Sequence, residues 1–500
     1  MGNELGTVIS TFEGPSTNEF SFVISNPVVR KGQFIQSENE DGLLIGIVSD
    51  ILRSNRYFER AESVAEYERS GAMPNFPTED WEYMIATARA LGVFKEDNLI
   101  RATIPAAPGK KVETVDDGML KRFLGFDEDG LNLGKLGTHA VDVKVSLNGL
   151  LQKHLSILAM SGAGKSYLSG VILEELLDRK AEQGRIGVVV FDVHGEYIGF
   201  RSGEYANRTH IFEGKKLKIA LHKVSPYMLG KFLPELSAAQ QRDITEIMQE
   251  LKHETKEKGA AYTLSDLINR VECSDIKDSV KGTLLSWLSQ LNRLRLFGRE
   301  DYPSIANLAQ SGKLSVIDLS DIDSLKKKQL IVAYFAEKLF NSRRKERIPP
   351  FLMLVEESHN FAREKAPKGS SISKGIIEKI AREGRKFGAS LCLVSQRPVQ
   401  LSTTALSQCN TNIILRVTNP YDIKHIGESC EGIDKHMLDA ITTLRVGEAM
   451  IIGEAVNHPV FVKVRRRKSK GSDRGKNIEL IARRFEEMME KKVKDVEAFL

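Results

Sequence analysis

Cysteine is scarce in this 500-residue sequence, which has only Cys273, Cys392, Cys409 and Cys430. No two of them form a CxxC pair, so the sequence offers neither the spacing of a zinc site nor a disulfide framework. Free thiols are typical of proteins in a reducing compartment, and we therefore expect a cytoplasmic protein.

Long apolar runs are also missing. No stretch approaches the ~18 consecutive apolar residues that a membrane span requires. The first residues, MGNELGTVIS, lack the basic and apolar regions of a secretory signal. We expect no contact with a membrane.

Charge of one sign is nearly balanced by the other. Lys and Arg number 72 and Asp and Glu 67, which leaves a net charge of +5. Such an excess does not identify a nucleic-acid-binding protein, so that case depends on local clusters. Aromatic residues are only 7% and do not interleave with the basic runs, which disfavours stacking on single-stranded bases.

The chain is long enough for about three domains. Residues 1–145 consist mostly of short alternating stretches, such as Phe20–Ile24 and Leu43–Val48, separated by Gly, Asn and Pro. They predict a small β-barrel, with a β-sandwich as the alternative. Residues ~55–95 carry apolar side chains at helical spacing and predict a helical insert in that domain.

Residues 146–455 have a different pattern, in which short runs that are wholly apolar alternate with helical stretches. The runs are HLSILAM, IGVVVFDV, LSVIDL, FLMLVEE, SLCLVSQ, NIILRV and GEAMIIG. Strands that are apolar on both faces are typical of a doubly wound α/β domain. Capping patterns at Ser237/Gln240 and Thr263/Asp266 predict a helical insertion over ~225–300. Residues 456–500 predict a basic strand, a linker and an amphipathic helix.

The sharpest motif is AMSGAGKS, Ala159–Ser166, which lies between a predicted strand and a predicted helix. Small residues let backbone N–H groups surround a phosphate, Lys165 adds a cation for the β/γ oxygens, and Ser166 offers a hydroxyl to Mg²⁺. The opening Ala159 replaces the usual Gly, which Ala tolerates unless φ is positive. The predicted nucleotide-binding residues here are Ser161, Gly162, Ala163, Gly164, Lys165, Ser166 and Tyr167.

Acidic residues end two other predicted strands. Glu356 and Glu357 follow FLMLV, and Asp192 ends GVVVF. Ligands of open α/β sheets lie at the carboxyl ends of the strands, so these acids are expected beside the phosphate loop. We assign Glu356 to the metal and Glu357 to the attacking water, and we expect Asp192 to orient water or the lysine.

The segment IAREGRKFGASLCLVSQRP adds Arg382, Arg385 and Gln396. Two arginines three apart share a helix face, and either can serve a neighbouring subunit's γ-phosphate as an arginine finger. Gln396, at a strand end, can sense the γ-phosphate. The alternative is a solvated basic face.

Local basic clusters give the case for DNA. The loop after the acidic pair is rich in Gly, Ser and Lys, and its Lys365, Lys368 and Lys374 are the expected phosphate contacts. A denser cluster spans 463–470, and others lie at 326–328 and 343–347. Each is equally readable as a solvated surface.

These motifs, in the order GAGKS, FDVHGEY, LVEESHNF, AREGRKFG, SQRP and SQCNTNIILRVTNPYD, resemble the HerA helicases of the HerA–FtsK branch of P-loop ATPases. The resemblance covers nearly the whole chain and implies a RecA-like core in a homohexameric ring. It also implies ATP-driven movement on double-stranded DNA, with a NurA-type nuclease as partner in DNA end resection. It makes Arg382 the finger in trans, with Arg385 as substitute, and places His458 and Pro459 at a neighbour's nucleotide.

Three functions remain open from the sequence. The first is an ATP-dependent translocase on double-stranded DNA. The second is a GTPase or phosphotransferase, against which the missing NKxD signature speaks. The third is a nucleotide-dependent DNA clamp or a pump of the FtsK or conjugative type.

Overall fold

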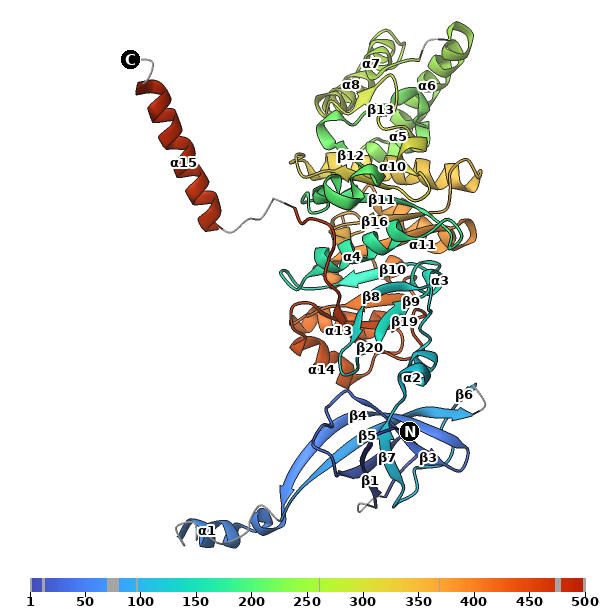
Figure 1. The fold of residues 1–500 in the computed structure, drawn as a ribbon. Coiled ribbons are helices and arrows are strands. Elements are labelled where there is room, and N and C mark those ends of the chain that lie inside the picture. Colours follow the sequence, from blue (N-terminus) through green and yellow to red (C-terminus); the bar gives the residue numbers. More distant parts are fainter. Residues whose placement is uncertain are drawn as a thin grey trace. The chain divides into compact units, whose positions relative to one another are not determined.

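The computed structural model describes residues 2–10, 14–69, 81–95, 98–259, 261–367, 369–472 and 478–497. The chain forms two compact units (Figure 1). The barrel unit comprises residues 1–130, 134–145 and 456–463, and the core unit comprises 131–133, 146–455 and 464–500.

The barrel unit is built on antiparallel strands in the order β2-β1-β7-β3-β4-β5-β6, and a further pairing of β2 with β5 closes six of them into a barrel. The strands are β1 Glu4–Ile9, β2 Glu19–Ile24, β3 Phe34–Asn39, β4 Gly42–Asn55, β5 Glu82–Lys95, β6 Asn98–Ile100 and β7 Lys111–Thr114. Alternating side chains such as Phe20, Phe22, Ala86 and Ala88 fill the interior. The predicted barrel is confirmed, and the sandwich alternative is wrong.

The helical insert predicted over ~55–95 is wrong for most of its length. Only the 3-10 turn Arg56–Glu59 and helix α1, Ala61–Arg69, are helical, while residues 82–95 form β5. Residues 70–80 lie outside the described part. The apolar spacing in 81–91 matched a helix, but β5 pairs with both β4 and β2 and buries every second residue, Ala86 and Ala88, in the barrel.

The same unit includes helix α2, Asp117–Leu124, which begins at the Asp116 N-cap and ends at Gly125 with φ +75°. Strands β20 (Val460–Val464), β8 (Leu131–Leu136) and β9 (Asp142–Val145) follow one another in a sheet.

The core unit is organised around a buried sheet in the order β12-β15-β11-β16-β17-β10-β18-β19. All its pairings are parallel except β18 with β19. The strands are β10 Leu155–Leu158, β11 Gly187–Asp192, β12 Thr209–Glu213, β15 Leu314–Asp318, β16 Phe351–Val355, β17 Ala389–Ser395, β18 Thr411–Ile414 and β19 Glu448–Gly453. The predicted α/β class is confirmed, and the buried positions on both strand faces account for the wholly apolar runs.

Helices connect these strands. They are α3 Leu147–Leu151, α4 Lys165–Asp178, α9 Ile305–Leu308, α10 Leu325–Arg344, α11 Lys374–Glu383, α12 Thr403–Leu406, α13 Pro420–Ser429 and α14 Lys435–Thr443. The predicted helical insertion consists of α5 Pro226–Phe232, α6 Ala238–Lys258, α7 Leu264–Glu272 and α8 Asp278–Arg293. Both predicted capping boxes are present. The short strands β13 Ile219–Ala220 and β14 Phe297–Gly298 pair beside it, and α15, Ile478–Glu497, is the predicted C-terminal helix.

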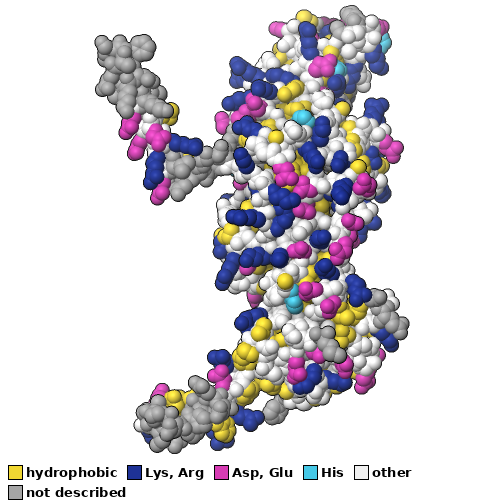
Figure 2. Space-filling model, in the orientation of Figure 1, with side chains coloured by type: hydrophobic (Ala, Val, Ile, Leu, Met, Phe, Trp, Pro, Cys, Tyr) yellow, Lys and Arg dark blue, Asp and Glu magenta, His cyan; other side chains and the backbone are white. Residues whose placement is uncertain are grey.

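Charges of both signs are interspersed on the visible face of the core unit, with no large patch of one sign (Figure 2). That distribution agrees with the small net charge of the sequence. Among the described helices, none combines the length and the apolar character that crossing a bilayer demands.

Candidate nucleotide-binding site

The candidate site lies at the carboxyl edge of the core sheet, where four neighbouring parallel strands end. β10 leads into the phosphate loop, β16 into Glu356 and Glu357, β17 into Gln396, and β11 ends at Asp192. Parallel pairing alone brings these chain segments together, because the carboxyl ends of parallel strands share one edge.

The phosphate loop has the backbone that the motif predicted. Gly162 and Gly164 have φ +77° and +100°, and a Cβ added at Gly162 would meet nothing within 4 Å. Helix α4 begins at Lys165, and no side chain caps its N-terminus. Its first N–H groups therefore suit an anionic ligand. Ala159 does not have a positive φ, so the missing first glycine causes no strain.

Around the loop, the other predicted residues vary in burial. Ala163 is buried, Ser166 is half-buried, and Ser161 and Tyr167 are exposed. The open face above Gly162 and the uncapped helix end fit a phosphate group, and the hydroxyl of Ser166 follows directly in the first turn.

Lys165 is buried between three carboxylates. Its Nζ lies 3.2 Å from Glu356 Oε1, 3.2 Å from Glu357 Oε1 and 4.0 Å from Glu196 Oε2. Burial disfavours the ammonium form, but the surrounding carboxylates outweigh it and raise the pKa of Lys165. The site therefore keeps a fixed positive charge where the motif requires one.

Glu357 occupies a left-handed backbone conformation, with φ +47°, immediately after β16 and Glu356. Such a conformation costs a non-glycine residue about 1–2 kcal/mol, and strain of this kind is common at functional positions. The Gln396 amide donates a hydrogen bond to Glu357 Oε1, and His359 Nδ1 lies 3.4 Å from Oε2. Glu357 and Gln396, which the sequence assigned to the attacking water and to sensing the γ-phosphate, are thus in direct contact. His359 belongs to the motif LVEESHNF, but the sequence assigned it no role.

Glu356 is wholly buried. Its Oε2 accepts hydrogen bonds from the backbone N–H groups of Val193 (2.9 Å) and His194 (3.3 Å). Burial opposes its ionisation, but the Lys165 ammonium and nearby hydrogen bonds hold the pKa of Glu356 below its usual range. It links β16 to the turn that follows β11.

Asp192 lies at the expected edge of the sheet, and its carboxylate contacts the backbone. Its carboxylate accepts N–H bonds from Gly195, Glu196 and Tyr197 at 2.7–3.0 Å, so it caps the turn after β11. Burial and then the charge of Glu356 raise its pKa to about 8. Asp192 shapes the turn, and Glu196, to which the sequence assigned no role, is the residue of that turn that approaches Lys165.

Arg382 and Arg385 lie at the opposite edge of the sheet from this site. Both are exposed at the end of α11 and in the 3-10 turn Gly384–Phe387, just before β17 begins. His154, which precedes β10, bonds the carbonyl of Ala381 through Nε2 at 2.9 Å and fixes that position. Neither arginine therefore reaches the nucleotide site of its own chain.

The turn Asn457–Pro459 packs within the barrel unit. The His458 ring stacks on Phe123 at 4.8 Å, and Asn457 donates hydrogen bonds to the carbonyls of Phe123 and Leu124. His458 Nε2 is buried and, in the described part of the chain, lacks a hydrogen-bond partner.

The three lysines predicted to contact DNA in the loop after the acidic pair differ in their surroundings. Lys365 is exposed, with φ +48°, and Lys368 lies outside the described residues. Lys374 lies 3.9 Å from Glu364 and 3.7 Å from Glu378, so its charge is partly neutralised.

The cluster at 463–470 contacts the protein itself. Arg465 pairs with Glu174 at 2.8 Å and Glu175 at 2.7 Å, and Lys468 pairs with Asp178 at 2.7 Å. The sequence left DNA contact and a solvated surface open for this cluster, and the structure shows that these side chains pair with α4.

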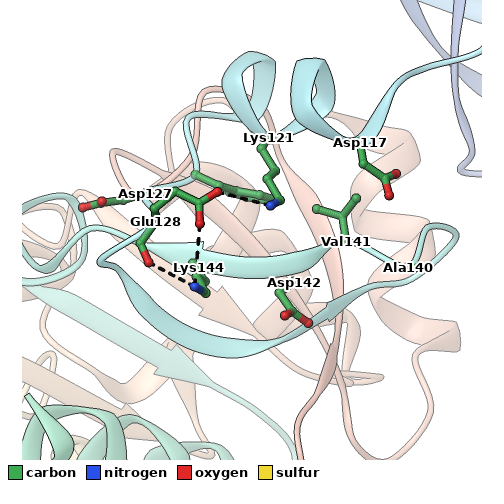
Figure 3. Close-up of a pocket in the computed structure, with 9 residues that line it drawn as sticks. Asp117, Lys121, Asp127, Glu128, Ala140, Val141, Asp142 and Lys144 are labelled. Carbon is green, nitrogen blue, oxygen red and sulfur yellow. Dashed lines mark hydrogen bonds and ion pairs between the residues drawn. The ribbon is translucent and has the colours of Figure 1, made fainter.

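A separate hollow lies in the barrel unit near α2 and β9 (Figure 3). Its Glu128 is paired with Lys121 at 3.2 Å and Lys144 at 3.9 Å. None of its lining residues belongs to the predicted machinery. In the described residues, no group of three or more His, Cys, Asp or Glu side chains could hold a metal ion by itself.

The chain is similar to several known proteins. Residues 131–339 match the family model described as the central domain of helicase HerA. The chain is 29% identical to a probable helicase of Methanocaldococcus jannaschii over 89% of this chain and 88% of the relative. It is also 29% identical to the DNA double-strand break repair helicase HerA of Pyrococcus furiosus, over 87% of each chain. The solved VirB4 of Thermoanaerobacter pseudethanolicus shares the fold over 68% of this chain and 98% of that one, with a TM-score of 0.56 and 16% identity.

Proposed function

We propose that this chain is a member of the HerA family of helicases and an ATP-driven translocase on double-stranded DNA. The match of residues 131–339 to the HerA central domain and the similarity to two helicases over most of the chain support this proposal. The proposal extends to a homohexameric ring that works with a NurA-type nuclease in DNA end resection. The break-repair name of the Pyrococcus relative supports that extension.

The observation that carries the proposal is the arrangement around Lys165. A phosphate loop, a buried lysine, an acidic pair and a glutamine, which follow three parallel strands, meet at one edge of the sheet. Ion pairs that only stabilise a fold need neither the uncapped helix end nor the strained backbone at Glu357.

The chemistry follows from these positions. The first N–H groups of α4 and the Lys165 ammonium hold the phosphates, and Glu357 accepts a proton from the attacking water. Gln396 and His359 fix the orientation of Glu357. Ser166 and Glu356 are the residues that would hold Mg²⁺, which would supply positive charge to offset that of the phosphates.

The position of Arg382 supports hydrolysis between subunits. An arginine at the opposite edge of the sheet is unable to serve its own site, but in a ring that edge can face the next subunit's nucleotide. Arg385 is the substitute for the same role, and His458 and Pro459, both half-buried, are the further candidates for a contact between subunits.

The DNA contact is assigned to the loop after the acidic pair. Lys365 is exposed there, eight residues after Glu357, so a change at the nucleotide can reach it through a short stretch of chain. Contacts of this type bind phosphates without reading sequence.

The test is the ATPase rate of the purified chain with and without duplex DNA, with Lys165→Ala as control. We expect duplex to raise the rate several-fold and Lys165→Ala to abolish it. Stimulation by single strands alone would contradict the proposal. An unchanged rate with tight, nucleotide-dependent duplex binding would favour a clamp, and the translocase would then be wrong.

A further inference from the structure

Residues 465–471, called the strap below, cross the helix that carries the phosphate loop. Tyr167, Gly170, Glu174 and Asp178 lie on one face of α4, and each contacts the strap. The backbone N–H of Arg467 donates to the Tyr167 hydroxyl at 2.6 Å, in the first turn of α4 and two residues from Lys165.

Glu174 is the centre of this contact and is wholly buried. It accepts hydrogen bonds from the Arg465 guanidinium (2.8 Å), the Lys468 N–H (2.9 Å), the Ser469 N–H (2.6 Å) and the Ser469 hydroxyl (2.7 Å). Burial opposes its charge, but these donors lower the pKa of Glu174. A buried carboxylate satisfied in this way is specific for one position of the strap.

Two glycines make room for the strap on opposite sides. A Cβ at Gly170 of α4 would lie 2.7 Å from the Arg467 guanidinium. A Cβ at Gly199 would lie 2.1 Å from the Lys470 carbonyl oxygen. Gly199 belongs to the 3-10 turn Ile198–Arg201, directly after the Asp192–Tyr197 turn, and the Arg467 guanidinium lies 5.1 Å over the Phe200 ring.

The strap thus joins the two halves of the nucleotide site. One half is the phosphate helix with Lys165, and the other is the turn after β11, which supplies Glu196 and the N–H groups bound by Glu356. We propose that the strap is a clamp that positions the phosphate helix against this turn, with Glu174 and Arg465 as positioning residues for ATP binding and hydrolysis.

This role for the strap differs from DNA contact, which was one of the two possibilities that the sequence left open for the basic cluster at 463–470. Arg465, Arg467 and Lys468 are engaged with α4 and Phe200, while Arg466 is exposed. The two roles therefore make opposite predictions for neighbouring arginines. The inference rests on the ATP site of the proposed function, and not on DNA or on a ring.

The test compares Gly199→Ala and Glu174→Gln with two controls. Gly199→Ala displaces Lys470 without removing a charge, and Glu174→Gln keeps the size of the side chain but breaks the ion pair with Arg465. Gly282→Ala, whose Cβ meets nothing within 4 Å, and Arg466→Ala are the matched controls. Affinity for a fluorescent ATP analogue without DNA, kcat and KM, affinity for duplex DNA, and amide hydrogen exchange of residues 165–178 and 465–471 are measured on the full chain.

We expect both test variants to weaken analogue binding about tenfold or more and to lower kcat, since small displacements of positioning groups cost up to about 100-fold. Exchange in the first turn of α4 should rise, and both controls should match the wild type. The proposed role of the strap would be overturned if the test variants showed fast exchange in the strap but kept analogue affinity and kcat. It would also be overturned if Arg466→Ala and Glu174→Gln lost duplex binding equally. If the wild-type chain binds the analogue but its ATPase rate does not respond to duplex DNA, the translocase proposal is wrong, while the proposed role of the strap still holds.

Discussion

At the scale of single residues, the site depends on carboxylates that differ in their surroundings. Lys165 pairs with both Glu356 and Glu357. Glu356 is further fixed by two backbone N–H groups, whereas Glu357 is held by the side chain that follows β17 and by one in the turn after β16. Because Glu357 alone is oriented by an amide and an imidazole, we assign it the proton transfer and Glu356 the link between strands and metal shell.

Glu357→Gln tests that division. We expect ATP-analogue affinity within a few-fold of the wild type and a loss of kcat of about 10²–10⁴-fold, because the amide lacks the basicity for proton transfer. Steady-state ATPase assays with analogue titrations measure both quantities, and Glu383→Gln on α11 is the control. Full turnover in Glu357→Gln would remove its catalytic assignment.

The residues of the site differed in how far the sequence could predict them. Lys165, Glu356, Glu357 and Gln396 each follow an apolar strand, so their meeting point followed from parallel pairing. His359 and Glu196 lie within the motifs LVEESHNF and FDVHGEY, but neither was assigned a role, and their proximity to the site arises from turns whose shape the sequence does not give. The sequence left DNA contact and a solvated surface open for the charges at 465–468, because a basic run does not reveal that its partners are Glu174 and Asp178.

At the scale of elements, one buried imidazole joins three parts of the core. His154 precedes β10, bonds the Ala381 carbonyl of α11, and accepts the Leu391 N–H of β17 through Nδ1 at 3.0 Å. Only a neutral imidazole with its proton on Nε2 satisfies both contacts. Burial lowers the pKa of His154 to about 4.

Stability is therefore expected to depend on pH through His154. The unfolded chain, with a pKa near 6.5, binds this proton more readily than the folded one, so stability is lost as pH falls from about 6.5 toward 4. The contribution of this one group is about 3 kcal/mol. Urea unfolding between pH 4 and 8 should show a weaker pH dependence in His154→Gln than in the wild type, and parallel profiles would refute this role.

Strands and helices were predicted correctly where the burial of the side chains and the spacing of apolar residues along the chain indicated the same element. The core strands are apolar on both faces, and the capping boxes at Ser237 and Thr263 mark helix starts directly. It failed over 82–95, where apolar spacing fitted a helix but pairing with two neighbouring strands determined the structure. Local periodicity does not contain those long-range pairings.

At the scale of the whole molecule, the account requires one subunit to complete the site of another. Lys165 and Arg382 lie at opposite edges of one sheet, so a variant of each should be inactive alone. Loss of a finger arginine typically costs about 10³–10⁵-fold in rate.

Mixing Lys165→Ala with Arg382→Ala subunits tests this arrangement. In a randomly mixed ring about one interface in four pairs an intact Lys165 with an intact neighbouring Arg382, so ATPase activity should partly return. Mixing either variant with Lys165→Ala/Arg382→Ala subunits is the control and should restore nothing. A mixture that stays as inactive as its components would contradict the arginine finger in trans.

The central claim is that hydrolysis moves the protein along a duplex, and displacement of a triplex-forming oligonucleotide from double-stranded DNA measures this most directly. The account predicts that the wild type strips the third strand only with hydrolysable ATP, and that Lys165→Ala and Glu357→Gln leave it bound. Duplex-stimulated ATP hydrolysis by the wild type with the triplex still intact would contradict it.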